Sequence, residues 1–210
     1  MTLSELQKAV VGLYEEVPLL DGSKVRYINF DNAASTPALE PVLNKISEFS
    51  KWYSNVHRGT GFKSQLSSQV FEESRKMIAR FVGADDSSAV IFCKNATEAI
   101  NRLARRFQCP IMSRTDAAEK PVILTSVMEH HSNELPWRKV GRVVHIALNS
   151  DGTISTSDFD EKIDRFRGQV CLVAISGASN VTGYINPIHE YAVKTHAAGA
   201  QIAVDAAQLA

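Results

Sequence analysis

Short continuous apolar runs alternate with helical patterns from residue 89 onward. The apolar runs predict strands, and they cover residues 89–93, 122–124, 143–148, 170–175 and 202–204. Apolar residues at helical spacing predict helices over residues 97–107, 133–140, 158–166 and 187–198. Strands that alternate with helices build βαβ units, and strands that are apolar throughout are buried on both faces. We therefore expect an α/β fold, with a mostly parallel sheet and helices on both faces.

The first part of the chain has a less regular pattern. Helical spacing predicts helices over residues 3–17, from Pro41 to about residue 53, and over residues 67–81, with Gly83 as the residue that ends the last one. A short strand is expected over residues 25–30, and a glycine-bearing loop over residues 54–63. We expect residues 1–24 to form a helical arm and residues 25–210 to form one domain.

The composition excludes several classes of protein. The chain has 210 residues, 23 of them basic and 23 acidic, so it lacks the basic excess that is typical of nucleic-acid binding. Its apolar runs are too short to span a membrane, and its first residues lack the pattern of a secretory signal. Cys93, Cys109 and Cys171 form no CxxC pair, which indicates reduced thiols, with Cys93 and Cys171 in the core. We therefore expect a cytoplasmic protein without nucleic-acid or membrane partners.

Polar or small residues follow four of the predicted strands. In chain order they are Asn95, Ala96 and Thr97 at a helix start, then His130, then Asn180, and finally Asp205 and Gln208. Each group alone suits an ordinary helix cap or polar loop, but the carboxyl ends of parallel strands share one edge of a sheet. A helix start can bind a phosphate, an imidazole can stack on an aromatic ring, and a carboxylate can keep a ring nitrogen protonated. Together they predict a pocket for pyridoxal phosphate.

Three common motifs are missing from the sequence. It contains no GxxxxGK[ST], no GxGxxG after a strand and no HExxH. These absences argue against a P-loop nucleotide site, a dinucleotide site and a zinc protease site. No metal ligands are expected.

The same residues carry a family resemblance, in six motifs that occur in order from about residue 27 to the end of the chain. They are Phe-Asp-Asn-Ala-Ala-Ser-Thr-Pro at 30–37, Val-His-Arg-Gly at 56–59, Asn-Ala-Thr-Glu-Ala-Ile-Asn at 95–101, Met-Glu-His-His-Ser-Asn at 128–133, Ala-Ser-Asn-Val-Thr-Gly at 178–183 and Val-Asp-Ala-Ala-Gln at 204–208. In these motifs the sequence resembles the class V aminotransferase superfamily of fold type I pyridoxal-phosphate enzymes, specifically the cysteine desulfurase and selenocysteine lyase group. The resemblance implies the large-domain fold of these transferases, with its last part and the small domain absent.

The resemblance also implies a role for each site residue. Those on the cofactor side are Ala96 and Thr97 at the phosphate, His130 stacked on the ring with a further acid or base role, Asn180 beside the ring, Asp205 at the ring nitrogen and Gln208 at the phenolic oxygen. Ala33, Ala34 and His57 are implied on the substrate side.

Two departures from the family pattern affect the expected activity. Asn95 and Ala96 stand where the family commonly has Gly-Thr, so one hydroxyl at the phosphate is lost. The family's Schiff-base lysine lies shortly beyond the aspartate, whereas the last lysine here is Lys194, upstream of Asp205. None of the three cysteines matches the desulfurase nucleophile. We therefore expect this chain to be inactive alone.

Several functions fit these observations. The leading one is the N-terminal portion of a desulfurase-like enzyme that cleaves the C–S bond of L-cysteine or a related amino acid, as a homodimer and with a sulfur-acceptor protein as a further partner. A class V aminotransferase or another pyridoxal-phosphate lyase fits the same motifs. A non-catalytic short form that binds the cofactor or a partner is a second class. A metal-dependent hydrolase using His130, His131 and Asp205 is the weakest, because it explains neither the helix start at Thr97 nor the loop at Asn180.

Overall fold

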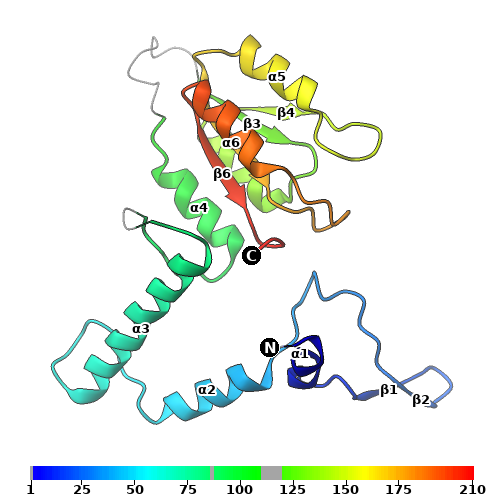
Figure 1. Cartoon of the computed structure of the whole chain (residues 1–210), viewed down its shortest axis with the longest axis vertical. Coiled ribbons are helices and arrows are strands. Elements are labelled where there is room, and N and C mark those ends of the chain that lie inside the picture. Colours follow the sequence, from blue (N-terminus) through cyan, green and yellow to red (C-terminus); the bar gives the residue numbers. More distant parts are fainter. Residues whose placement is uncertain (1, 86–87, 110–119) are drawn as a thin grey trace. The chain divides into compact units, whose positions relative to one another are not determined.

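The computed structural model describes residues 2–85, 88–109 and 120–210. The chain divides into two compact units, Met1–Ile91 and Phe92–Ala210. Each unit has its own helices and strands, and Figure 1 labels most of them. The division into an arm of residues 1–24 and a domain of residues 25–210 stays a prediction.

The first unit begins with a short helix and a two-stranded antiparallel sheet. Its elements are α1 (Leu3–Ala9), β1 (Glu16–Pro18), β2 (Lys24–Arg26), α2 (Glu40–Ser50) and α3 (Phe62–Phe81). The helix predicted over residues 3–17 is wrong beyond Ala9, because Gly12 adopts φ +76° in a turn and the following residues pair β1 with β2. The strand predicted over residues 25–30 is also longer than the observed β2.

Helix α3 starts earlier than its apolar pattern predicts. The hydroxyl of Ser64 donates to the carbonyl of Asn55, and the hydroxyl of Ser67 accepts the N–H of Ser54. These two buried serines bind the preceding loop to the first turns of the helix, so polar residues that resemble a loop in the sequence are helical here. At its other end, Gly83 adopts φ +67°, as expected for the residue that ends a helix.

The second unit is a parallel sheet of four strands in the order β4-β3-β5-β6. Its elements are α4 (Ala96–Arg106), β3 (Val122–Ser126), η1 (His131–Asn133), η2 (Leu135–Lys139), β4 (Arg142–Ile146), α5 (Thr156–Arg165), β5 (Val170–Ser176), α6 (Ile188–Ala197) and β6 (Gln201–Asp205). Every strand pair in this sheet is parallel. The predicted α/β class and the parallel sheet are therefore confirmed.

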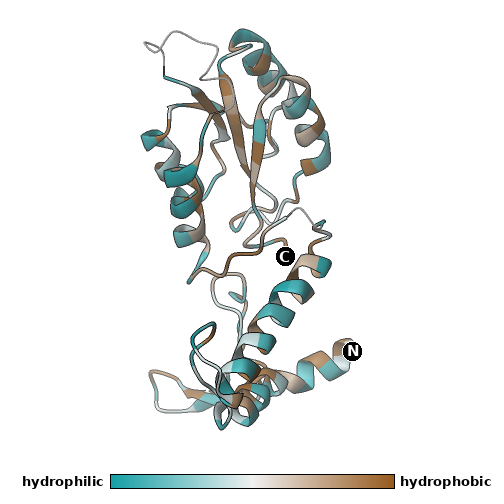
Figure 2. Ribbon diagram, turned by 90° about the vertical axis from the view of Figure 1, so that its left-hand side faces the viewer, coloured by the Kyte–Doolittle hydropathy of each residue, from teal (hydrophilic) through white to brown (hydrophobic). Residues whose placement is uncertain are grey.

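Two apolar cores lie on the two faces of this sheet. One combines strand residues with Phe159 of α5 and Tyr191 of α6, and the other combines strand residues with Ala104 of α4 and Trp137 of η2. Figure 2 shows apolar residues concentrated on the strands, with helices of mixed character on either side. Burial of both faces explains why β3 and β5 are apolar without alternation. None of the helices in the described parts of the chain has the length and apolar character that a membrane span requires.

Two predicted elements of this region are wrong. Residues 89–93 form no strand, and Ile91 and Phe92 are 69% and 42% exposed. An apolar run becomes a strand only when another strand pairs with it, and the run itself does not reveal its partner. The helix predicted over residues 133–140 is replaced by the short 3-10 turns η1 and η2, because Pro136 has no N–H to donate within an α-helix.

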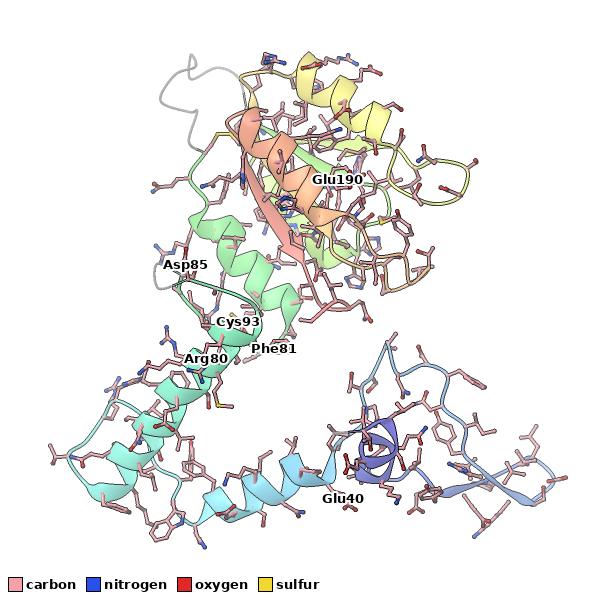
Figure 3. The ribbon with its side chains drawn as sticks, viewed as in Figure 1. Glu40, Arg80, Phe81, Asp85, Cys93 and Glu190 are labelled. Carbon is pink, nitrogen blue, oxygen red and sulfur yellow. A yellow bond between two sulfur atoms is a disulfide. The ribbon has the colours of Figure 1, made fainter. Side chains whose placement is uncertain are left out.

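The cysteines also differ from expectation. Cys109 and Cys171 form a disulfide with their Cα atoms 5.4 Å apart, so the prediction of three reduced thiols is wrong. Cys171 lies in the core of β5, as predicted, whereas Cys93 is partly exposed and free (Figure 3). The polar stretch of residues 109–120 falls mostly outside the described residues.

Candidate functional site

The first turn of α4 is held by two polar side chains. Asn95 Oδ1 accepts a hydrogen bond from the N–H of Glu98 at 2.9 Å, and Glu98 Oε2 accepts one from the N–H of Lys94 at 2.8 Å. The Lys94 N–H and the guanidinium of Arg102 hold the pKa of the Glu98 carboxyl below its ordinary value. The N–H groups of Ala96 and Thr97 have no acceptor within the helix, so they can serve an anion at the positive end of the helix dipole.

Asn95, at the position where the family motif commonly has glycine, caps helix α4. Asn95 is fully extended, and its side chain acts as the helix cap. Its amide therefore stabilises α4 itself. Thr97 is exposed at the helix start, and its hydroxyl remains available to a ligand together with the two backbone N–H groups.

The His130 ring is oriented by the turn that it begins. Nδ1 of His130 accepts the N–H of Ser132 at 3.2 Å and lies 2.8 Å from the Ser132 hydroxyl. The carbonyl of His130 accepts the N–H of Asn133 at 2.8 Å. Because Nδ1 accepts, the neutral ring carries its proton on Nε2. The exposed ring is thus fixed at its base by neighbours that are themselves buried, Ser132 and Asn133.

One open pocket joins the helix start to the histidine turn. Its volume is about 330 Å³, and it is lined by Thr97, Asn101, His130, His131, Ser132, Leu135, Pro136 and Lys139. This volume is near the lower end of the range found for small-ligand sites. The start of α4 and the His130 imidazole therefore face the same space, and the cofactor roles expected for Thr97 and His130 stay predictions.

Asp205 lies at the end of β6, beside the loop that follows β5. Its carbonyl accepts the N–H of Gly177 at 2.8 Å, and its Oδ1 accepts the N–H of Ala207 at 3.1 Å. A Cβ on Gly177 would come within 2.7 Å of Leu209 Cδ2, so glycine lets the turn after β6 pack on this loop. The half-buried Asp205 is thereby fixed at the carboxyl edge of the sheet, with the exposed Gln208 in the same turn.

The loop after β5 presents Asn180 at its tip. The Ser179 hydroxyl accepts the N–H groups of Val181 and Thr182, both at 3.2 Å, and Gly183 at φ +71° returns its N–H to the carbonyl of Ser179. This tight turn leaves Asn180 exposed. Asn180, Asp205 and Gln208 do not line the pocket of Thr97 and His130, but they belong to the same carboxyl edge of the sheet.

The predicted substrate-side residues belong to the other compact unit. Ala33 and Ala34 are exposed there. His57 adopts φ +57°, its N–H donates to the Ser68 hydroxyl at 2.8 Å, and its Nε2 lies 3.4 Å from Glu72 Oε1. A left-handed backbone costs free energy in a residue other than glycine, and such strain clusters at functional positions. A substrate-side role for these residues stays a prediction.

Glu129 lies next to His130, and no role is expected for it from the sequence. Its carboxylate accepts hydrogen bonds from Ser126, Asn133 and Ser176. The signal was present in the motif, since a carboxylate beside His130 is followed four residues later by an amide. Ser176, however, is 47 residues away in the sequence, so only the folded chain brings it to Glu129.

The geometry gives no support to a metal centre. Within the described ranges, no three histidine, cysteine, aspartate or glutamate side chains form a group that could hold a metal ion. The His130 and His131 rings lie 6.3 Å apart by their centroids. The polar groups of this edge instead suit a ligand with a phosphate and an aromatic ring, because they combine helix N–H groups, a hydroxyl, an imidazole and a carboxylate.

Known proteins resemble this chain over nearly all of its length. A family model described as aminotransferase class-V matches residues 28–210. A probable cysteine desulfurase of Halalkalibacterium halodurans is 34% identical over 100% of this chain and 50% of its own. Another, from Halobacterium salinarum, is 35% identical over 87% of this chain and 44% of its own. The chain spans about half the length of these curated relatives.

Solved structures agree with these relatives. The apo cysteine desulfurase from Thermococcus onnurineus superposes with a TM-score of 0.77 at 28% identity, over 97% of this chain and 47% of that one. The cysteine desulfurase CsdA from Escherichia coli gives 0.68 at 29% identity, over 85% of this chain and 44% of that one. The predicted fold of the pyridoxal-phosphate transferases is thus confirmed, for about half of such a protein.

Proposed function

Because this chain belongs to the aminotransferase class-V family, we propose that it forms the N-terminal, cofactor-binding half of a cysteine desulfurase-like enzyme. The observation that carries the proposal is the pocket shared by Thr97 and His130. A phosphate held at the start of α4 would lie in the space that the imidazole faces. Curated relatives that match the chain include proteins named cysteine desulfurase and probable cysteine desulfurase.

Pyridoxal 5′-phosphate is the proposed cofactor. The N–H groups of Ala96 and Thr97 and the Thr97 hydroxyl would hold its phosphate, and His130 would stack on its ring. The remaining partners are Asp205 for the ring nitrogen, Gln208 for the phenolic oxygen and Asn180 beside the ring. When bound, the cofactor supplies an electron sink for bonds at the amino-acid substrate.

The protein groups supply position and charge. An ionised Asp205 would hold a proton on the ring nitrogen through a charge-assisted hydrogen bond, which keeps the ring electron-poor. His130, with its proton on Nε2, would present a ring face to the cofactor and a mobile proton near the substrate. Ala33, Ala34 and His57 are proposed as substrate-side residues.

The proposed reaction is cleavage of the C–S bond of L-cysteine or a related amino acid, with sulfur passed to an acceptor protein. Lys194, the last lysine of these 210 residues, donates from Nζ to both oxygens of Asp160 on α5, at 2.7 and 2.8 Å. An ammonium group held by this carboxylate suits a structural ion pair. We therefore propose that the Schiff-base lysine is not among these residues and that the chain alone does not turn over.

A comparison of two ligands tests the cofactor proposal. Equilibrium dialysis should give at least about tenfold tighter binding of pyridoxal phosphate than of pyridoxal, because the phosphate contributes charge-assisted hydrogen bonds. Equal affinities, or no binding of either ligand, would contradict the proposal.

Product analysis tests the reaction in the whole protein that carries this chain. With L-cysteine and a thiol reductant, we expect alanine and sulfide in equal amounts. Formation of a keto acid at the expense of the amino donor would identify an aminotransferase instead. Binding of the cofactor with neither product would identify a non-catalytic form.

A homodimer and a cytoplasmic location complete the proposal. Light scattering of the whole protein tests whether it is a homodimer.

A further inference from the structure

We propose that Glu129 is the positioning residue that sets His130 relative to Asp205 at the cofactor site, an inference that rests on the proposed function. Glu129 directly precedes His130 in the chain. Its carboxylate reaches across the carboxyl edge of the sheet to the ends of two neighbouring strands and to the turn that orients the imidazole.

Three hydrogen bonds fix the carboxylate. Oε1 accepts the hydroxyl of Ser126 at 2.5 Å, and Ser126 ends β3. Oε2 accepts the amide of Asn133 at 2.7 Å and the hydroxyl of Ser176 at 2.6 Å, and Ser176 ends β5. All three donors are buried, at 1%, 1% and 5% exposure. A half-buried carboxylate with three neutral donors has its position determined from three directions.

Two of these donors, Asn133 and Ser176, are connected to the site. Asn133 lies in η1, where its N–H bonds the carbonyl of His130 and its Oδ1 accepts the indole N–H of the fully buried Trp137. Ser176 is the register partner of Asp205 in the adjacent strand. Through Asn133, Glu129 is bonded to the turn that holds His130 and to the buried Trp137. Through Ser176, Glu129 is bonded to β5, which pairs with the strand that carries Asp205.

The proposed role of Glu129 depends on the geometry of its hydrogen bonds and not on its charge. The donors are two hydroxyls and an amide, none of them charged, and a hydroxyl can also accept. A glutamine at position 129 can keep its oxygen on Asn133 and Ser176 and turn its amide N–H₂ toward the Ser126 oxygen. Alanine loses all three bonds and leaves buried donors without an acceptor. The two substitutions should therefore behave differently.

The test compares Glu129→Gln, Glu129→Ala and the wild-type chain at a temperature where circular dichroism finds all of them folded. Two quantities are measured: the affinity for pyridoxal phosphate, and the ¹⁵N shifts of the His130 imidazole in the ligand-free chain. Glu134→Ala is the matched control. Glu134 lies in the same segment and is only 7% exposed, and its carboxylate bonds Arg138 and His145.

We expect Glu129→Ala to bind about tenfold more weakly and to shift the His130 signals, with Glu129→Gln within about twofold of wild type. Glu134→Ala should lower stability but leave both readouts unchanged. Wild-type affinity and unchanged shifts in Glu129→Ala would overturn the inference. If that variant does not fold, Ser176→Ala removes a single bond and should weaken binding about threefold, whereas no change there would overturn the inference.

The two proposals fail in distinguishable ways. If the wild-type chain does not bind pyridoxal phosphate, the proposed function fails, and the His130 shifts of the ligand-free variants still decide whether Glu129 orients the ring. If the wild type binds and the variants match it in both readouts, the inference about Glu129 alone fails.

Discussion

Ser176 at the end of β5 is the register partner of Asp205 at the end of β6. The hydroxyl of Ser176 donates to Glu129, one residue before His130. Strand β6 carries Asp205, the proposed partner of the ring nitrogen, and it pairs with β5. Strand β5 is in turn bonded through Ser176 to Glu129, which precedes His130. The parallel sheet creates this proximity, because its strands all end at the same edge.

Thr97 gives the first prediction. Thr97→Val removes the hydroxyl at the start of α4 but keeps the backbone N–H, so pyridoxal phosphate should bind about tenfold more weakly, the cost of one hydrogen bond to a charged group. Equilibrium dialysis measures the affinity. Thr156→Val is the matched control, since Thr156 opens α5. If both variants bind like wild type, Thr97 has no part in the site.

Ala96 allows the opposite change. Ala96→Thr would add the hydroxyl that the family motif carries and this chain lacks. The same dialysis should give a severalfold tighter complex, because the helix start gains a donor for the phosphate. Weaker binding would indicate that the phosphate does not approach the first turn of α4.

Glu98 makes the stability of the second unit depend on pH. Its pKa lies below the ordinary 4.5, because the Lys94 N–H and Arg102 favour the ionised form. A depressed pKa contributes stability above the unfolded-state value and loses it as the pH falls through the folded-state value. The stability difference between wild type and Glu98→Gln should therefore shrink between about pH 5 and pH 3 in urea titrations. A difference that stays constant over this range would exclude the contribution.

The disulfide predicts a thiol count. Cys109 and Cys171 are 62 residues apart, so their bond should stabilise the fold by roughly 4 kcal/mol if it acts through the entropy of the unfolded chain. Unfolded, unreduced protein should react with a thiol reagent at Cys93 alone, and at three cysteines after reduction. If three thiols react before reduction, and reduction leaves the unfolding midpoint unchanged, the bond does not form.

The part of the fold that the sequence predicts is the part set by local pattern and burial. Strands β3 and β5 are buried on both faces, so their apolar runs identify them without knowledge of their neighbours. The run at residues 89–93 has the same composition but no strand partner within the described residues. Pairing is a long-range property, which a single run cannot reveal. The same limit hides the contact of Cys109 with Cys171.

In the candidate site, too, local sequence patterns can be predicted, whereas contacts between remote segments cannot. The pocket is lined by both Thr97 and His130. The residues before Thr97 form no strand, and Asn95 and Glu98 organise the helix start instead, so the position of Thr97 does not follow from the predicted strand. The bond between Glu129 and Ser176 could not be predicted, since it joins the segment after β3 to the end of β5, and the two are remote in the sequence.

The most direct test of the proposed cofactor site is the affinity of the 210-residue chain for pyridoxal phosphate when Asp205 is replaced by asparagine. Asp205→Asn keeps an acceptor for the Ala207 N–H but removes the charge that would pair with the ring nitrogen. The exposed Asp164→Asn serves as the control. The wild type and the control should bind alike, and Asp205→Asn should bind at least about tenfold more weakly. Equal binding by all three, or no binding by any, would contradict the proposed cofactor site.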